Sequence, residues 1–344
     1  MATIYTESFS NKTENLSYCM AIIIFLTHFG IGWQIETGYL TLPAMSYFFF
    51  LSGYHFYLAY SNGRSMIRLL GKRVKTLIIP YILWNIIAFI SHMMFTYLRT
   101  GMFIKETKWY DIFIVYVNGN ACADVPLWYI WRLTSFFIVA KLLYLLIFNR
   151  KIGIIVLLLL HGFNLWNLPA YYSFRYFLPV FLLGGYTALH FGEAFQKYWG
   201  GGEIQRIISL KACFAISVYI LIYLYAIYRY PQFKGIQQYI VVAVSSVVLW
   251  IVTAKISLPA KNYLKIPNTT FLYCFHFILY DWVYAATRKI IPYCGERIDG
   301  YKILGYLMSI SLAMTIILVV DYGMKRCFPQ IYNILIGGRV KKES

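Results

Sequence analysis

Residues 43–85 read PAMSYFFFLSGYHFYLAYSNGRSMIRLLGKRVKTLIIPYILWN and set the architecture of the chain. They contain two apolar helices joined by a basic hairpin without an acidic residue; its cations are Arg64, Arg68, Lys72, Arg73 and Lys75. A loop of this charge between lipid-facing helices is typical of the cytoplasmic face of a membrane. The same charges suit either a phosphorylated cytosolic ligand or anionic lipid head groups.

The composition indicates a membrane protein. Of the 344 residues, 60% are hydrophobic and 13% are charged, whereas a soluble domain has about 45–50% and about 25%. Apolar runs of about 20 residues, the length that spans a bilayer, recur along the chain. Lipid offers the backbone no hydrogen-bond partner, so these runs must be helices. We therefore predict an all-α polytopic integral membrane protein with a single transmembrane domain over residues 1–344.

The hydrophobic runs predict a bundle of about ten transmembrane helices. Their expected ranges are 16–33, 43–60, 77–98, 127–148, 152–168, 176–191, 207–228, 238–256, 269–287 and 301–322. With an even number of spans, both termini lie on the same side of the membrane. Lys and Arg are concentrated in the hairpin, the other loops of that side and the C-terminal tail, so we predict that both termini are cytoplasmic.

The net charge of +18 does not indicate a nucleic-acid-binding protein. The basic residues lie in loops between spans, where membrane topology explains them, and no soluble domain is expected that could bind nucleic acid. The six cysteines lack the spacing of a metal site. Cys122 and Cys294 fall in two predicted outer loops, and a disulfide between them is one possibility in an oxidising compartment.

Ionisable residues inside the spans are the best functional candidates, because such groups face a protein interior or a water-filled cavity. His28 lies in the outer half of the first span and His276 in the middle of the ninth. An imidazole can accept a hydroxyl proton near neutral pH. Either histidine could instead be a hydrogen-bonded core residue. Arg132, next to Trp131, is expected at the mouth of a cavity.

Five motifs, taken together, are similar to those of a known family. They are MSYFFFLSGYHF (45–56), GKRVKTLIIPY (71–81), PLWYI (126–130), FLPVFLLGGY (177–186) and FLYCFHFIL (271–279). In order and spacing the chain resembles the membrane-bound acyltransferase 3 family, which acylates sugars of surface polysaccharides and other extracytoplasmic acceptors. The resemblance extends over most of the chain.

The resemblance implies a reaction and a set of partners. The donor would be a cytosolic acyl-CoA, with acetyl-CoA expected and no metal, and the acceptor a hydroxyl of a cell-surface or lipid-linked glycan. Lys72, Arg73 and Lys75 would meet the donor phosphates. His28 would be the general base, and His276 would orient it or relay protons. Arg132 would face the acceptor or stabilise the oxyanion. The protein would be a multi-pass protein of the cell membrane.

One feature departs from the family pattern. Family members usually carry an arginine before the first-span histidine, where this chain reads NLSYCMA (15–21). Two alternatives therefore stay open. The chain could be a transporter or flippase-like protein that moves a glycan or acyl intermediate without chemistry, or a non-catalytic membrane scaffold.

Overall fold

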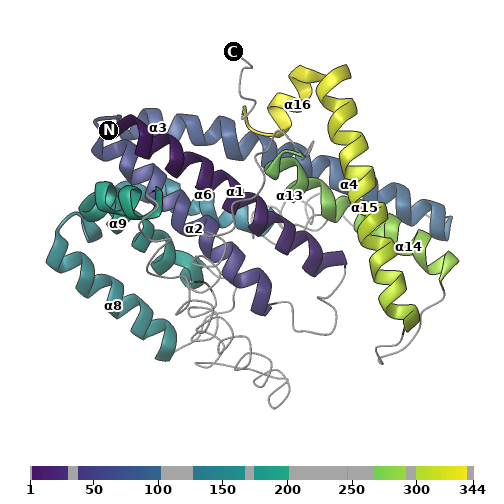
Figure 1. Cartoon of the computed structure of the whole chain (residues 1–344), viewed down its shortest axis with the longest axis horizontal. Coiled ribbons are helices and arrows are strands. Elements are labelled where there is room, and N and C mark those ends of the chain that lie inside the picture. Colours follow the sequence, from purple (N-terminus) through teal and green to yellow (C-terminus); the bar gives the residue numbers. More distant parts are fainter. Residues whose placement is uncertain are drawn as a thin grey trace. The chain divides into compact units, whose positions relative to one another are not determined.

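The computed structural model describes residues 2–29, 38–101, 127–166, 174–200, 246, 267–291 and 300–338. Within these ranges the regular structure is entirely helical, which confirms the all-α prediction. The helices in Figure 1 are α1 (Ala2–Phe29), α2 (Gly38–Ser61), α3 (Met66–Arg73), the π-helical turn η2 (Val74–Ile78), α4 (Ile79–Thr100), α6 (Trp128–Ile138), α7 (Ala140–Ile147), α8 (Arg150–Trp166), α9 (Phe174–Gly200), α13 (Thr269–Ile278), α14 (Tyr280–Ile290), α15 (Gly300–Cys327) and α16 (Pro329–Leu335).

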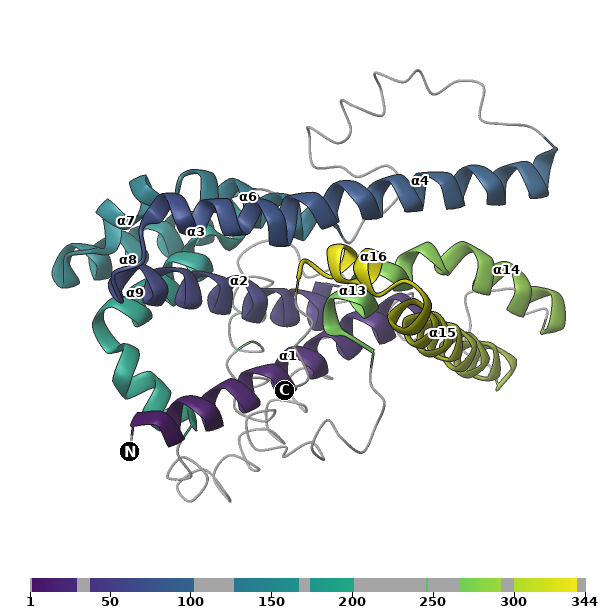
Figure 2. The same ribbon diagram turned by 90° about the horizontal axis from the view of Figure 1, so that it is seen from above.

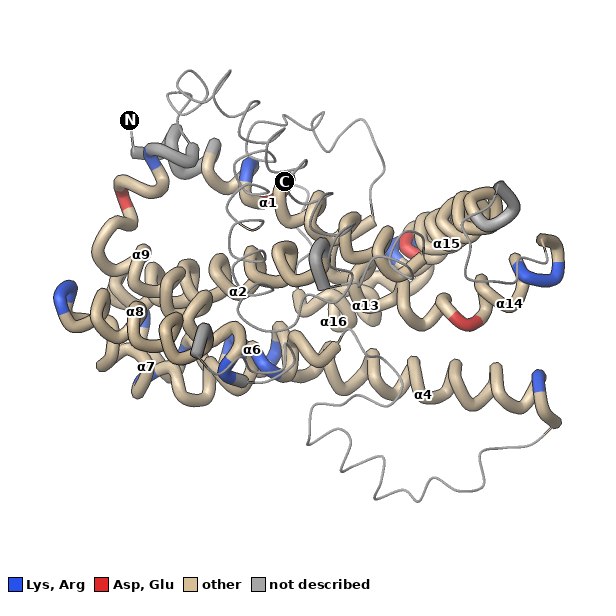
Figure 3. The backbone as a smooth tube through the Cα atoms, turned by 90° about the horizontal axis from the view of Figure 1, so that it is seen from below, with Lys and Arg blue, Asp and Glu red and all other residues tan. Residues whose placement is uncertain are grey.

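Long uncharged stretches run along α2, α4 and α15, and basic residues gather at helix ends (Figure 3). Among the described residues, Met66–Thr100 and Ile303–Cys327 are long and apolar enough to cross a membrane, and the pair α6–α7, bent by 69°, would be a third span. These helices support a membrane protein. The ten-span count, the single domain over residues 1–344 and the cytoplasmic termini stay predictions, and spans 207–228 and 238–256 lie outside the described ranges except for Ser246.

The basic hairpin of the sequence prediction is shorter in the structure. The turn after α2 ends at Ser65, whose side-chain oxygen caps the next helix by accepting from the Arg68 N–H at 3.4 Å. Helix then continues without interruption from Met66 to Thr100. The predicted third span, 77–98, therefore continues a helix that begins before it, at Met66. Lys72, Arg73 and Lys75 lie on a helix rather than in a loop.

The described residues divide into two compact units. Unit 1 comprises residues 1–24, 34–70 and 135–264, and α2 packed on α9 forms its centre. At Gly53 and Gly184 the space that a Cβ would fill is taken by the carbonyl oxygens of Phe181 and Phe50 respectively. Small residues allow this close backbone approach between helices in lipid, where packing rather than the hydrophobic effect drives association.

Unit 2 comprises residues 25–33, 71–134 and 265–344. Within it α4 contacts α13, α14 and α16, and α15 contacts the same three helices (Figure 2). Trp84 on α4 is buried at the centre, with its ring edge-to-face on Phe271 at a centroid distance of 5.5 Å. All six residues that the sequence predicts for the site, from Lys72 to His276 and including His28, belong to this unit.

Candidate active site

Two histidines from opposite ends of the chain meet in unit 2. His28 is in the last turn of α1 and His276 is on α13, and their ring centroids are 5.1 Å apart with an angle of 38° between the planes. We call His28 and His276 the histidine pair. The sequence proposed each as a functional residue, and the structure brings them together.

The two members of the histidine pair differ in environment. His276 is fully buried, and its Nδ1 lies 3.1 Å from the carbonyl oxygen of Leu272, one turn earlier. A carbonyl oxygen only accepts hydrogen bonds, so Nδ1 carries the proton, and in the neutral ring Nε2 keeps its lone pair. That Nε2 is buried and has no hydrogen-bond partner among the described residues. This nitrogen can therefore accept a proton from a substrate.

His28 is half-buried and its ring is held by aromatic contacts. It packs edge-to-face on Phe277 at 5.7 Å, and it forms no hydrogen bond to any residue in the described ranges. Phe29 supplies a further edge contact to His276 at 6.5 Å. Aromatic rings of α1 and α13 therefore surround the pair.

Arg132 reaches the neighbourhood of the histidine pair indirectly. It is half-buried on α6, one turn after Tyr129, and residues three apart share a helix face. Tyr129 packs edge-to-face on Tyr273 of α13 at 6.0 Å, and Tyr273 lies 6.1 Å from the His276 ring. The predicted cavity-mouth position of Arg132 stays a prediction.

The predicted phosphate-binding cations sit where the helix geometry changes. Lys72 and Lys75 are exposed and Arg73 is half-buried, and we call these three residues the cation turn. The π-helical turn begins at Val74, whose carbonyl accepts from the Ile79 N–H. Such insertions are rare and occur frequently at functional sites. The exposed ammonium groups make this turn a surface able to hold an anion.

Three of the other histidines have polar partners. In unit 1, Nδ1 of His161 lies 3.0 Å from the carbonyl of Leu157, and Nε2 of His190 lies 2.9 Å from that of Ile147. In unit 2, His92 pairs with Asp281 at 3.5 Å. Cys122 and Cys294 lie outside the described residues. No group of three or more potential metal ligands occurs among the residues that the structure describes.

One buried polar cluster was not anticipated from the sequence. Asp321 of α15 is buried and pairs with Lys325 one turn later, and it accepts a 2.6 Å hydrogen bond from the hydroxyl of Tyr332. Burial, together with the bond to this carboxylate, raises the pKa of Tyr332 above its usual range, so the hydroxyl remains the donor. The sequence signal was present, since an acid with a lysine four residues later at the end of an apolar run predicts an ion pair.

Comparison with known proteins links these observations to one family. A family model described as an acyltransferase domain (acyltransferase 3) matches residues 18–322, which is most of the chain. The matched region contains all six predicted site residues. No match was found among curated proteins or among solved structures.

Proposed function

The chain belongs to the acyltransferase 3 family, and from that premise we propose that it transfers an acyl group, most simply acetyl, from cytosolic acyl-CoA to a hydroxyl of a cell-surface or lipid-linked glycan. The observation that carries the proposal is the histidine pair inside the family-matched region. Acyl transfer needs a base at the acceptor hydroxyl, and a neutral imidazole with a free lone pair is suited to that task.

The chemistry needs one proton carrier. The acceptor oxygen attacks the thioester carbonyl carbon while its proton passes to an imidazole nitrogen. The carbon–sulfur bond then breaks, and the imidazolium returns the proton to the departing thiolate, so that free CoA and the ester leave. The sequence prediction gives the base role to His28. The tautomer set by Leu272 makes Nε2 of His276 the second candidate, and with His276 as base His28 would hold the substrate.

The donor would approach from the cation turn. Lys72 and Lys75 would contact the phosphates of acyl-CoA through charge-assisted hydrogen bonds. From Lys75 to Trp84 the helix advances about 14 Å at 1.5 Å per residue. Trp84 packs against Phe275 at 6.0 Å, next to His276. An extended donor with phosphates at one end and a thioester at the other fits this separation.

Arg132 would stabilise the negative charge that develops on the thioester oxygen or face the acceptor. Its guanidinium has five donors in a planar fork and keeps its charge. Preorganised donors of this kind stabilise the oxyanion of acyl transfer. The position of Arg132 one turn from Tyr129, which contacts α13, supports this role.

The proposal is tested in the native host by deleting the gene and analysing surface glycans by mass spectrometry. We expect the loss of one ester, its return with the wild-type chain, and no return with His28→Ala at equal protein level. In membrane vesicles, we expect release of free CoA from acetyl-CoA with the wild-type chain, and no release in the deletion strain or with His28→Ala. An unchanged ester pattern would refute acyl transfer, and an unchanged pattern combined with loss of the glycan itself would favour a transporter.

A further inference from the structure

The segment after α15 contacts the helix that carries the cation turn. Pro80 has no N–H, so the carbonyl of Thr76 lacks the donor that the residue four positions later supplies in a regular α-helix. At this carbonyl the backbone of Gly337 comes close, with a φ of 72°, and a Cβ added to Gly337 would fall on the Thr76 oxygen. Thr76 lies one residue after Lys75. The chain beyond α16 therefore packs directly against the π-helical turn.

A second contact fixes the same segment deeper along α4. The indole N–H of Trp84 donates to the carbonyl oxygen of Leu335 at 2.9 Å, and both side chains are buried. Leu335 is the last residue of α16, where carbonyl groups have no partner within the helix. We call residues 329–338, which make these two contacts, the C-terminal clamp.

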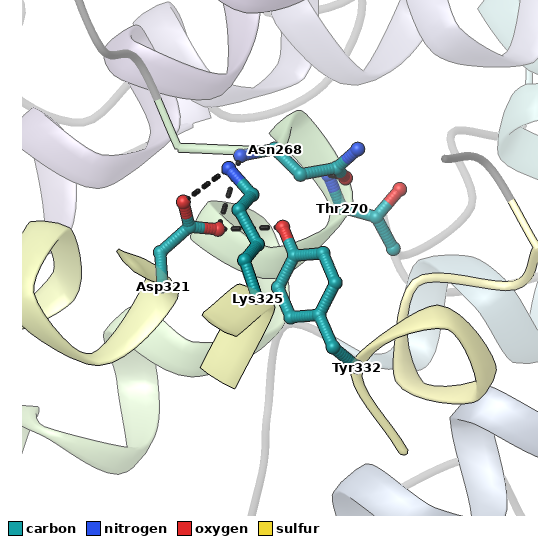
Figure 4. A network of polar contacts seen from close by, with 5 residues as sticks. All are labelled: Asn268, Thr270, Asp321, Lys325 and Tyr332. Carbon is teal, nitrogen blue, oxygen red and sulfur yellow. Dashed lines mark hydrogen bonds and ion pairs between the residues drawn. The ribbon is translucent and has the colours of Figure 1, made fainter. Parts of the chain in front are cut away.

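The clamp also contacts the helix of His276. Tyr332 of α16 and the backbone N–H of Asn268 both donate to Oδ1 of Asp321, at 2.6 and 3.4 Å (Figure 4). Asn268 is the N-cap of α13, and its side chain accepts from the Thr270 N–H at 2.9 Å. The Tyr332 ring lies 5.5 Å from that of Phe271. Asp321 therefore joins α16 to the first turn of α13, two turns before His276.

These contacts converge on one short segment. The clamp contacts the turn that presents the cations at Thr76. Through the buried Tyr332 it also contacts Phe271 in the first turn of α13 and, by way of Asp321, the N-cap Asn268. A helix transmits the position of its first turn along its length, so the register of α13 at Asn268 sets where His276 lies. Small displacements of catalytic groups reduce rates steeply.

We propose that the C-terminal clamp is the positioning element of the site: Gly337 holds the cation turn for donor binding, and Tyr332, through Asp321, holds α13 so that His276 stays against His28. Tyr332 and Gly337 are positioning residues, because neither touches the reacting atoms. The expected changes in KM and kcat rest on the proposed function, whereas the packing of the clamp on α4 and α13 does not.

The donor half of the proposal is tested with Gly337→Ala against Gly338→Ala. Both glycines have positive φ, but a Cβ at Gly338 meets nothing within 4 Å, so the pair separates the contact from the backbone strain. In membrane vesicles we expect Gly337→Ala to raise the KM for acetyl-CoA about tenfold with little change in kcat. Equal behaviour of the two variants would overturn this half.

The histidine half is tested with Tyr332→Phe, which keeps the ring on Phe271 and removes only the hydroxyl. We expect kcat to fall about tenfold while the KM for acetyl-CoA stays within about twofold. The control is Tyr322→Phe, because the Tyr322 hydroxyl accepts from Arg326 at 3.1 Å on the exposed side of α15. A fall in kcat together with a rise in the KM for acetyl-CoA, or an equal effect of the control, would show a merely structural role and overturn the proposal.

Hydrogen exchange of the full chain in detergent separates failure of this inference from failure of the proposed function. Gly337→Ala should accelerate exchange at residues 74–79, and Tyr332→Phe at residues 268–272, without faster exchange elsewhere. If the wild type releases no CoA while these local changes occur, the acyltransferase proposal fails and the clamp stands. If exchange is unchanged, or increases throughout the chain, the clamp is refuted whatever the activity.

Discussion

Helices of unit 1 approach one another at glycines and through tyrosine hydroxyls bonded to backbone carbonyls, whereas those of unit 2 meet at ionisable side chains. In unit 1 the glycines of LSGY and LLGGY interlock, since a Cβ at Gly53 or Gly184 would collide with the backbone of the facing helix. Tyrosines of the same helix donate to backbone carbonyls, as Tyr57 does to Ala140 at 2.8 Å. In unit 2 the contacts converge on ionisable groups, the histidine pair and Asp321.

This difference separates two kinds of family motif. LSGY and LLGGY resemble functional signatures in the sequence, but their glycines allow two helices to pack at close range. The motifs around Lys72 and His276 instead place chemically competent groups in unit 2. Similarity to a family motif therefore does not by itself assign chemistry to a residue.

The largest effect is expected from the histidine pair. Replacing His28 or His276 with Ala should reduce acetyl transfer by about 10²–10⁴-fold, the contribution of a positioned acid or base. His161→Ala is the matched control, because it removes a histidine with the same bond to the carbonyl one turn earlier, in unit 1. Rates are measured as CoA release at equal protein level. If His161→Ala were equally inactive, the assignment of the reactive groups to unit 2 alone would be wrong.

The next effect concerns stability in unit 1. Gly184→Ala should lower the free energy of unfolding by about 1–3 kcal/mol, the range for overpacking a tight contact. Gly162→Ala should be neutral or stabilising, because a Cβ there meets nothing within 4 Å and Ala favours helix. Denaturant unfolding in detergent micelles measures both. A Gly184 variant as stable as the wild type would show that close approach does not hold α2 to α9.

Charge removal at the cation turn should have a smaller effect that is confined to donor binding. Lys72→Gln combined with Lys75→Gln is expected to raise the KM for acetyl-CoA about tenfold, with a smaller ratio at high salt because exposed charges are screened. Arg64→Gln combined with Arg68→Gln serves as the control. If the control raised the KM for acetyl-CoA equally, the basic residues of this region would serve only to orient the chain in the membrane.

The smallest effect is expected at the half-exposed pair His92–Asp281. Asp281→Asn should change the free energy of unfolding by less than about 1 kcal/mol and leave CoA release unaltered. A large loss of activity would extend the reactive part of unit 2 beyond the histidine pair and would assign Asp281 a role in proton transfer.

The sequence predicted the helical class, and two of its candidate residues lie together in the structure. His28 and His276 were chosen because ionisable groups inside apolar runs are unfavourable unless they face protein or water. Their meeting could not be derived from periodicity, because residues far apart in the chain come together only by tertiary packing. The C-terminal clamp was missed for the same reason: its partners Thr76 and Trp84 on the Met66–Thr100 helix, and Asn268, which it reaches through Asp321, are distant in sequence from residues 329–338.

The hairpin shows the converse error. Clustered charges were taken as a loop, but Arg68, Lys72 and Lys75 recur at helical spacing, and long basic side chains extend from a helix toward water without ending it. The helix therefore starts at Met66, directly after Ser65.

Hydrophobic runs, the distribution of charge and the order of the family motifs determine by themselves that this chain is a helical membrane protein of the acyltransferase 3 family. These properties are local or additive along the chain, so no coordinates are needed to read them. Only the tertiary structure decided that His28 faces His276 and that α16 contacts both α4 and α13. Each of these depends on side chains that close packing brings within a few ångströms, and local sequence does not encode such contacts.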